Sequence, residues 1–229
     1  MHVSQNTMRT VGHAAWIGAW VGVVLAPLHA LSRFATAEGR EDLQFAPTRL
    51  WAEPAARRLR PLLEWADPDT VYLTYGKVWL FPFLAATVCA FLVWGSRDRR
   101  GLERVAWPIT LTGLVIATVS VVGDYFTPWI DASFLFLGIP GTLISLAGSL
   151  LLGIALLRRG FRPRLTALLL ILWFPLLFVL SSVASMGAAA LPMLFAWGLA
   201  GRTTASTLAK PATKPDRIDA PEEPAPQSS

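Results

Sequence analysis

Long runs of apolar residues constrain the fold of this chain more than any other feature. They cover residues 14–34, 78–94, 105–122, 134–157 and 165–200, and short charged segments separate most of them. At ~1.5 Å per residue, one helix over the last run would measure roughly 54 Å, against a bilayer hydrocarbon core of ~30 Å. We therefore expect this run to reverse near residues 181–187, giving two spans at about 165–182 and 186–200.

The composition favours lipid over water as the solvent. Apolar residues make up 54% of the 229 residues and charged residues only 15%, whereas about 25% are charged in typical soluble domains. We predict an all-α fold: a polytopic integral membrane helix bundle with about six transmembrane helices. The net charge of +5 does not indicate a nucleic-acid partner, because the arginines cluster at the ends of the apolar runs. The expected surroundings are a lipid bilayer.

The domain organisation follows from these runs. We expect a cytoplasmic N-terminus at 1–12, a helix bundle over 13–200 and a disordered cytoplasmic tail at 201–229, where Thr, Pro, Lys and acidic residues replace apolar ones. Within the bundle, the polar segment 37–76 is expected on the extracytoplasmic face. It contains "PAARRLRPLLEWA" at 54–66, which predicts a short amphipathic helix that lies either on the membrane or on the protein itself.

The first apolar run has a second interpretation. Arg9 precedes it and "ATA" at 35–37 resembles a signal-peptide cleavage site. Signal sequences have apolar cores of about 7–15 residues, and this run is longer and contains His29 and Arg33 near its end. A retained transmembrane helix is therefore the favoured interpretation.

The charged loops predict the orientation. Arg97, Arg99, Arg100 and Arg104 follow the second run, and four arginines lie between 158 and 164 after the fourth run. Arginine-rich short loops stay on the cytoplasmic side during insertion. The segment "GDYFTPWID" at 123–131 has two acids and no Lys or Arg, so we expect it outside. Six spans then place both termini in the cytoplasm.

The outer ends of the spans hold the candidate functional residues. His29, Asp124 and Asp131 are expected at one membrane depth, where they could supply acid and base groups or bind a cation. Arg33 could hold a polar headgroup, with Tyr125 and Trp129 shaping the pocket. The alternative is an ion-pair and hydrogen-bond network that only fixes the loops, with the two aromatic residues anchored at the membrane interface.

The interiors of the predicted spans carry hydroxyls but no charge. The hydroxyls on the third and fourth runs could line a polar path or join helices; they are Thr112, Thr118, Ser120, Thr142, Ser145 and Ser149. Ion-coupled carriers usually need buried charges, so the absence of charge argues against that class. Gly148 and Gly153 near these hydroxyls favour close helix contacts.

No cofactor is predicted. His13 and His29 are sixteen residues apart, roughly 24 Å along a helix, so together they cannot ligate one haem. His2 lies in the N-terminal tail, which makes a three-histidine zinc site implausible, and we predict no metal site. The sequence also has no phosphate-binding loop, HExxH or GxSxG motif.

Three stretches resemble a known group of proteins. "WAEPA" at 51–55, "EWADPDTVYLTYGKVWL" at 64–80 and "GSLLLGIALLRRGFRPR" at 148–164 are similar to stretches of uncharacterised multi-span membrane proteins of high-GC Gram-positive bacteria. The resemblance covers about residues 13–200. It implies a bacterial plasma membrane location and no particular activity or catalytic residue.

Three functions remain open from the sequence. The first is a non-catalytic accessory component that binds another membrane protein, favoured because no catalytic motif or buried charge is found. The second is an enzyme acting on a lipid or isoprenoid at the outer interface. The third is a small carrier for an uncharged or amphipathic solute. A convergence of His29, Asp124 and Asp131 would favour the second, and a polar cavity at mid-membrane depth the third.

Overall fold

The computed structural model describes residues 4–184 and 186–208, and all its regular elements are helical in these ranges. The long helices are α1 (Gln5–Ala35), α5 (Leu80–Gly95), α6 (Glu103–Phe126), α8 (Ile139–Arg158), α9 (Arg164–Val183) and α11 (Leu191–Leu208). The shorter elements are η1 (Glu38–Gln44), α2 (Ala46–Arg58), α3 (Arg60–Leu63), α4 (Pro68–Val78), α7 (Ile130–Ser133), η2 (Phe134–Gly138, a π-helical turn) and α10 (Met186–Ala189). The all-helical prediction is confirmed.

Five helical segments are long and apolar enough to cross a membrane, where the sequence predicts about six. They are Gln5–Ala35, Pro68–Gly95, Glu103–Phe126, Ile130–Arg158 and Arg164–Val183. The helix at the expected sixth span, α11, starts apolar but continues through Arg202, three threonines and one serine. Its apolar half is nevertheless part of the core, since Met193, Leu194 and Trp197 are fully buried.

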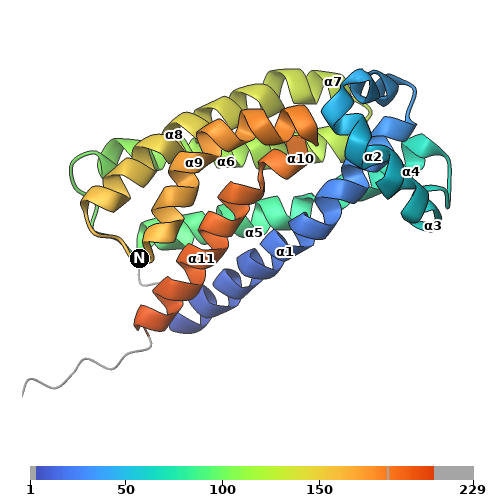
Figure 1. The fold of residues 1–229 in the computed structure, drawn as a ribbon. Coiled ribbons are helices and arrows are strands. Elements are labelled where there is room, and N and C mark those ends of the chain that lie inside the picture. Colours follow the sequence, from blue (N-terminus) through green and yellow to red (C-terminus); the bar gives the residue numbers. More distant parts are fainter. Residues whose placement is uncertain (1–3, 185, 209–229) are drawn as a thin grey trace, which may run out of the picture.

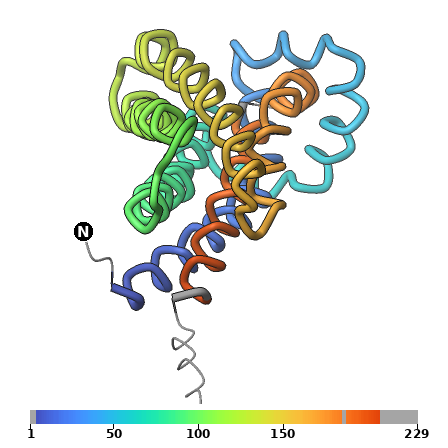
Figure 2. Tube along the Cα trace, turned by 90° about the vertical axis from the view of Figure 1, so that its left-hand side faces the viewer, coloured from blue at the N-terminus to red at the C-terminus, as the bar shows by residue number. Residues whose placement is uncertain are grey.

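The six long helices form a closed bundle. Around it α1 contacts α5, α5 contacts α6, and the contacts continue through α8, α9 and α11 back to α1. The loops 97–104 and 158–164 lie at the left of Figure 1 with the start of α1 and the end of α11, and we call this the arginine end. The opposite end carries α2, α3, α4 and α7 (Figure 1), and we call it the cavity end. Figure 2 shows the bundle from the side of the arginine end.

Apolar side chains cover the outside of the bundle, while small polar ones lie inside. Large exposed apolar residues occur on every long helix from α1 to α9, including Trp20, Phe91, Val119, Leu143 and Phe178. In the interior, the hydroxyls of Thr87 and Thr118 form a 2.9 Å hydrogen bond between α5 and α6. This distribution is the reverse of a water-soluble bundle and suits a lipid environment.

Small residues let α6 and α8 approach closely. A Cβ atom on Gly113 would collide with the backbone of Ser145, and one on Gly148 would collide with the backbone of Thr110. Gly153 plays the same part between α8 and α9, where it faces Ala167. The expectation of close helix contacts at Gly148 and Gly153 is confirmed, and van der Waals packing stabilises this seam.

The segment 37–76 folds into η1, α2, α3 and most of α4. The helix expected at 54–66 begins earlier, at Ala46, and Pro61 divides it so that α2 ends at Arg58 and α3 begins at Arg60. Proline cannot donate a backbone hydrogen bond, which explains the break. Ala52 and Leu63 pack on the end of α1, so of the two expected positions the segment lies on the protein's own surface.

Helix α4 starts where the sequence "DPDT" predicts a helix or turn. The side chain of Asp67 accepts a hydrogen bond from the Thr70 backbone amide at 2.9 Å. Hydrogen bonding to the Thr70 side chain and to its backbone amide lowers the pKa of Asp67. Pro68 occupies the first turn, where its missing amide proton costs nothing. The α4 helix leads into α5 with only Trp79 between them, forming the candidate span Pro68–Gly95.

Two boundaries differ from the sequence-based expectation. The loop expected at 123–131 shrinks to residues 127–129, because α6 continues to Phe126 and α7 begins at Ile130. The tail expected to be disordered from residue 201 starts as helix, since α11 continues to Leu208. Residues 1–3 of the expected N-terminal segment and residues 209–229 of the tail lie outside the described residues.

Candidate functional site

A cavity of about 870 Å³ occupies the bundle at the cavity end. Its wall includes residues of α1, α4, α6, α8 and α9, and segment 37–76 contributes to its rim. Along α6 it extends from Asp124 to Leu114, which is ten residues or roughly 15 Å. Because α6 contains 24 residues, the cavity reaches about the middle of the bundle.

Five of the six predicted site residues line this cavity. His29 and Arg33 come from α1, Asp124 and Tyr125 from the last turn of α6, and Asp131 from the first turn of α7. The short 127–129 loop brings the two aspartates to the same opening. Trp129 does not line the cavity, and 73% of its surface is exposed. The structure therefore does not place Trp129 on the wall of this cavity, where the sequence-based hypothesis expected it.

His29 lies in an aromatic cluster. Its ring stacks on Tyr72 with ring centres 4.8 Å apart, and the edges of Tyr125 and Trp79 meet it at 5.5 and 6.3 Å. The Tyr125 hydroxyl lies 3.1 Å from His29 Nε2 and fixes the imidazole. His29 is only 5% exposed, yet its Nδ1 has no hydrogen-bond partner within the described chain. His29 Nδ1 can therefore form a hydrogen bond with a bound molecule.

Asp124 is the buried carboxylate of the site. It is 8% exposed, and its Oδ2 accepts a hydrogen bond from the Ser120 hydroxyl one turn earlier at 3.1 Å. Its Oδ1 is buried without a partner among the described residues. The neighbouring Ser133 hydroxyl donates to the Ser120 carbonyl at 3.2 Å. Since a buried polar atom without a partner costs free energy, an occupant that donates to Oδ1 is favoured.

The exposed rim of the cavity is acidic. Glu38, Glu41, Asp42, Asp69 and Asp131 contribute carboxylates, and Arg33 is the one Lys or Arg side chain on the wall in the part of the chain that the structure describes. Arg33 Nε is already bound to Asp42 Oδ2 at 3.0 Å. A hydrogen bond holds helix α2 beside this rim: Trp51 Nε1 donates to the Val183 carbonyl of α9 at 2.7 Å.

The deeper wall is mostly apolar with a few hydroxyls. Ser120, Thr142 and Ser145 from α6 and α8 line it among larger apolar side chains, which include Phe83, Leu114, Trp173, Leu177 and Met193. Of the other hydroxyls considered from the sequence, Thr118 bonds to Thr87, and Thr112 is exposed. The cavity thus combines a charged rim with an apolar interior, a division that suits an amphipathic molecule.

The bundle is packed tightly between this cavity and the arginine end. Trp107 of α6 and Trp197 of α11 are both fully buried, with ring centres 5.6 Å apart. Leu152 and Leu156 of α8 and Leu170 of α9 fill the same region. The cavity therefore does not extend to the arginine end.

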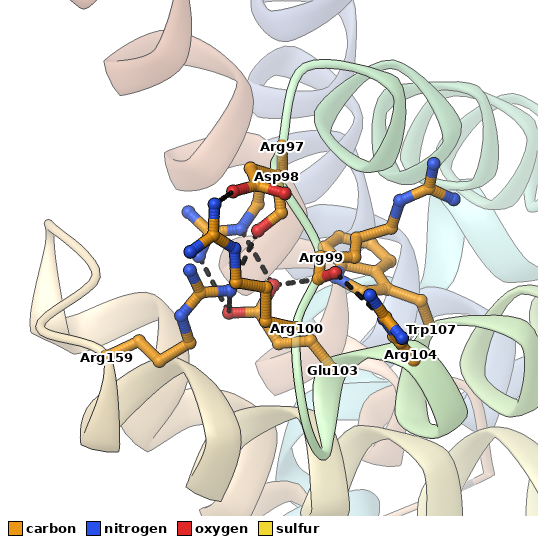
Figure 3. A network of polar contacts seen from close by, with 8 residues as sticks. All are labelled: Arg97, Asp98, Arg99, Arg100, Glu103, Arg104, Trp107 and Arg159. Atoms are coloured by element: carbon orange, nitrogen blue, oxygen red, sulfur yellow. Dashed lines mark hydrogen bonds and ion pairs between the residues drawn. The ribbon is translucent and has the colours of Figure 1, made fainter.

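Glu103 closes the arginine end with an ion-pair network (Figure 3). Its carboxylate is fully buried and accepts from Arg97 Nη2 at 2.8 Å and from Arg97 Nε at 3.2 Å. Arg159 Nη1 lies 3.2 Å from the same carboxylate, and Trp107 Nε1 lies 3.4 Å from it. Arg159 also donates to the Asp98 carbonyl at 2.8 Å. The two arginine-rich loops are thereby joined.

Several site residues could not be singled out from the sequence. Tyr72 and Trp79 lie in or next to a segment whose aromatic residues resemble membrane anchors, so their sequence position gives no sign of an inward orientation. Glu103 is one acid in an arginine-rich loop, and only the arrival of Arg159 shows that it is buried. The one part of the deeper wall that the sequence could indicate is the set of hydroxyls on Ser120, Thr142 and Ser145. Polar residues inside apolar runs usually face the bundle interior.

The described residues contain no group of three or more His, Cys, Asp or Glu side chains placed to hold a metal ion. No hydrogen bond joins His29 to Asp124 or Asp131 in the described part of the chain, so a preformed acid–base pair is not seen there. Comparison with known protein families, curated proteins and solved structures finds no match. The chemistry of the site must therefore be inferred from its geometry.

Proposed function

We propose that this chain is a multi-pass membrane protein that binds an amphipathic molecule in the cavity between its helices. The molecule enters at the cavity end, keeps its polar group at the acidic rim and places its apolar part in the bundle interior. The observation that carries this proposal is the 870 Å³ cavity, whose lining includes three residues with a buried polar atom that has no hydrogen-bond partner in the described chain: His29 (Nδ1), Trp79 (Nε1) and Asp124 (Oδ1).

The membrane location is supported by the five apolar helical segments and by the apolar outer surface. The proposed compartment is the bacterial plasma membrane. We propose that α11 provides a sixth crossing, with the arginine end in the cytoplasm, as arginine-rich loops are retained there. Both termini would then be cytoplasmic and the cavity would open to the outside.

The size of the cavity supports a small-molecule ligand. Binding sites for such molecules usually measure about 300–1,000 Å³, with mostly apolar walls and a few polar groups. A protein that served only to hold another chain would have no need for such a space, and an unfilled cavity lowers stability. The cavity therefore favours ligand binding over a purely accessory role.

Binding is also favoured over catalysis. His29 is held by Tyr125, and Asp124 is held by Ser120, so neither is oriented toward the other by a hydrogen bond. General acid–base catalysis requires the two groups to lie within reach of the same reacting proton or of a water between them. An enzyme acting on a lipid or isoprenoid thus has less support than a binding site made of the same residues.

A carrier for an amphipathic solute is the second candidate function. It is favoured by Ser120, Thr142 and Ser145, which extend the polar lining to the middle of the bundle. Transport would additionally require the arginine end to open, which means separating Trp107 from Trp197 and releasing Glu103 from its arginine partners. Flux of a bound molecule across a sealed vesicle would distinguish transport from binding alone.

The binding proposal can be tested by filling the cavity. Ala117 lines it from α6 and is 7% exposed, whereas Val119 on the same helix is 50% exposed on the outer surface. The full-length protein in phosphatidylcholine nanodiscs would be titrated with amphiphiles of twelve carbons, and binding followed by native mass spectrometry and by the rise in melting temperature. We expect Ala117→Phe to abolish binding and Val119→Phe to retain it.

A second cavity variant guards against misfolding. If Ala117→Phe does not fold, Thr142→Phe fills the space from the neighbouring helix α8. The proposal is wrong if the wild-type protein binds none of the amphiphiles, or if both cavity variants bind them as well as Val119→Phe does.

A further inference from the structure

The charges on the cavity wall are strongly unbalanced. Six carboxylates line the cavity against one guanidinium; the acids are Glu38, Glu41, Asp42, Asp69, Asp124 and Asp131. Arg33 is the single Lys or Arg on this wall among the described residues, and its ion pair with Asp42 neutralises both. Five acids are then left without an ion-pair partner within the described residues. Such a surface attracts cations and repels anionic headgroups.

The acids on the rim would not by themselves define a site, because exposed carboxylates are well solvated. The buried Asp124 supplies independent evidence. Its Oδ2 is satisfied by Ser120, while Oδ1 is buried without a hydrogen-bond partner in the described chain, and the residue lines the cavity. The Ser133 hydroxyl donates to the Ser120 carbonyl at 3.2 Å and also interacts with the Asp124 carboxylate. An N–H or O–H donor on a ligand would complete the hydrogen bonding of this carboxylate.

Aromatic rings line the same cavity. Tyr125 follows Asp124 in the chain, and its ring lies 6.0 Å from that of Tyr72 and 5.5 Å from that of His29. Trp79 lines the cavity on the other side of His29. The faces of Tyr and Trp rings attract organic cations, and this attraction increases where water is excluded. A cavity wall that carries both a buried carboxylate and these aromatic rings favours a cationic nitrogen over a neutral hydroxyl.

We propose that the ligand is an amphiphile whose headgroup is a protonated amine. The ammonium donates a hydrogen bond to Asp124 Oδ1 and lies beside Tyr125 and Tyr72. The rim acids raise its local concentration, and its apolar part extends toward Leu114 and Met193 in the deeper cavity. This inference rests on the proposed binding function and specifies the headgroup that the site selects.

The test compares four molecules with the same twelve-carbon chain: dodecylamine, dodecyltrimethylammonium, dodecanol and dodecanoate. Dodecylamine is positive and has N–H donors, whereas the trimethylammonium compound is positive without a donor. We expect dodecylamine to bind most tightly, dodecyltrimethylammonium next, dodecanol more weakly and dodecanoate least. Phosphatidylcholine nanodiscs without protein correct for partition of each molecule into the lipid.

Variants locate the headgroup. Asp124→Asn keeps the shape of the side chain and its acceptor for Ser120 but removes the charge. We expect it to weaken dodecylamine binding by about 10- to 150-fold, the usual worth of a hydrogen bond to a charged group, while dodecanol binding changes little. Asp131→Asn at the exposed rim should cost no more than about fivefold. Glu53→Gln is the matched control, because Glu53 is exposed on α2 and does not line the cavity.

Each outcome decides between the two proposals. If all four molecules bind with similar affinity, or if dodecanoate binds best, the amine inference is overturned while ligand binding stands. Equal binding of dodecylamine to the wild-type protein and to Asp124→Asn would also overturn it. If none of the four molecules binds, the proposed binding function fails as well. If Asp124→Asn does not fold, the order of the four affinities for the wild-type protein still tests the amine inference.

Discussion

Replacing Glu103 with glutamine should destabilise the protein by about 2–4 kcal/mol. The Glu103 carboxylate is fully buried and contacts Arg97 at 2.8 Å and Arg159 at 3.2 Å. Breaking a buried ion pair on one side typically costs about 3–5 kcal/mol, because the remaining charge has lost its partner. Arg97 and Arg159 are 20% and 35% exposed and can recover some hydration, so we expect a value somewhat below that range.

Glutamine is the informative replacement because it keeps the volume of the side chain and leaves no cavity. The loss corresponds to a change in the unfolding equilibrium of roughly 30- to 700-fold. It can be measured by titrating sodium dodecyl sulfate into mixed micelles and following tryptophan fluorescence, to which Trp107 beside Glu103 contributes. A double-mutant cycle with Arg97→Gln should give a coupling free energy of about 0.5–3 kcal/mol.

The adjacent Asp98–Arg100 pair provides the control. It lies in the same loop with a separation of 2.6 Å, but its side chains are 68% and 73% exposed. Exposed pairs contribute about 0–1 kcal/mol, so Asp98→Asn should have little effect on the free energy of unfolding. If Glu103→Gln is no less stable than Asp98→Asn, the buried network does not hold the arginine-rich loops together, and the reasoning from burial is refuted.

Two further predictions concern packing and orientation. Gly113→Leu should destabilise the protein by about 1–3 kcal/mol or more, because a side chain there collides with Ser145. In the same unfolding titration, Val119→Leu on the exposed surface should be nearly neutral. Equal losses of stability in the two variants would refute a tight α6–α8 seam. Cysteine labelling of intact cells with a membrane-impermeant maleimide should modify Thr127→Cys but not Ser96→Cys, with wild-type Cys89 silent because it is fully buried; modification of Ser96→Cys from outside would reverse the proposed topology.

The helical segments were largely predictable because apolar length is a local property. Each apolar run up to residue 183 lies in a helical segment long enough to cross a bilayer. The helix ends were less predictable, since apolar periodicity does not show where a helix stops. The α6 helix continues through Gly123, Asp124 and Tyr125 to Phe126, and this extra turn moves Asp124 from the expected loop into the buried wall.

The residues of the site were predicted better than their roles. His29, Asp124 and Asp131 were chosen as candidates because they are expected at the same depth in the membrane, and all three line one cavity. Depth alone gives no information about rotation around a helix axis. Trp129 therefore appeared equivalent to Tyr125, although Trp129 faces away and Tyr125 contacts His29. The contribution of Tyr72 depends on how α4 packs on α1, which no local pattern reveals.

The sequence by itself determined that the chain forms long apolar helices joined by short charged loops, because hydropathy and charge act on each segment separately. Only the tertiary structure decided that six helices enclose an 870 Å³ space instead of filling it. Whether neighbouring helix faces interlock or leave a gap depends on the shapes of side chains from five or more segments at once. The same long-range packing decided which carboxylates are buried: Glu103 meets two arginines, whereas Asp124 keeps one oxygen free.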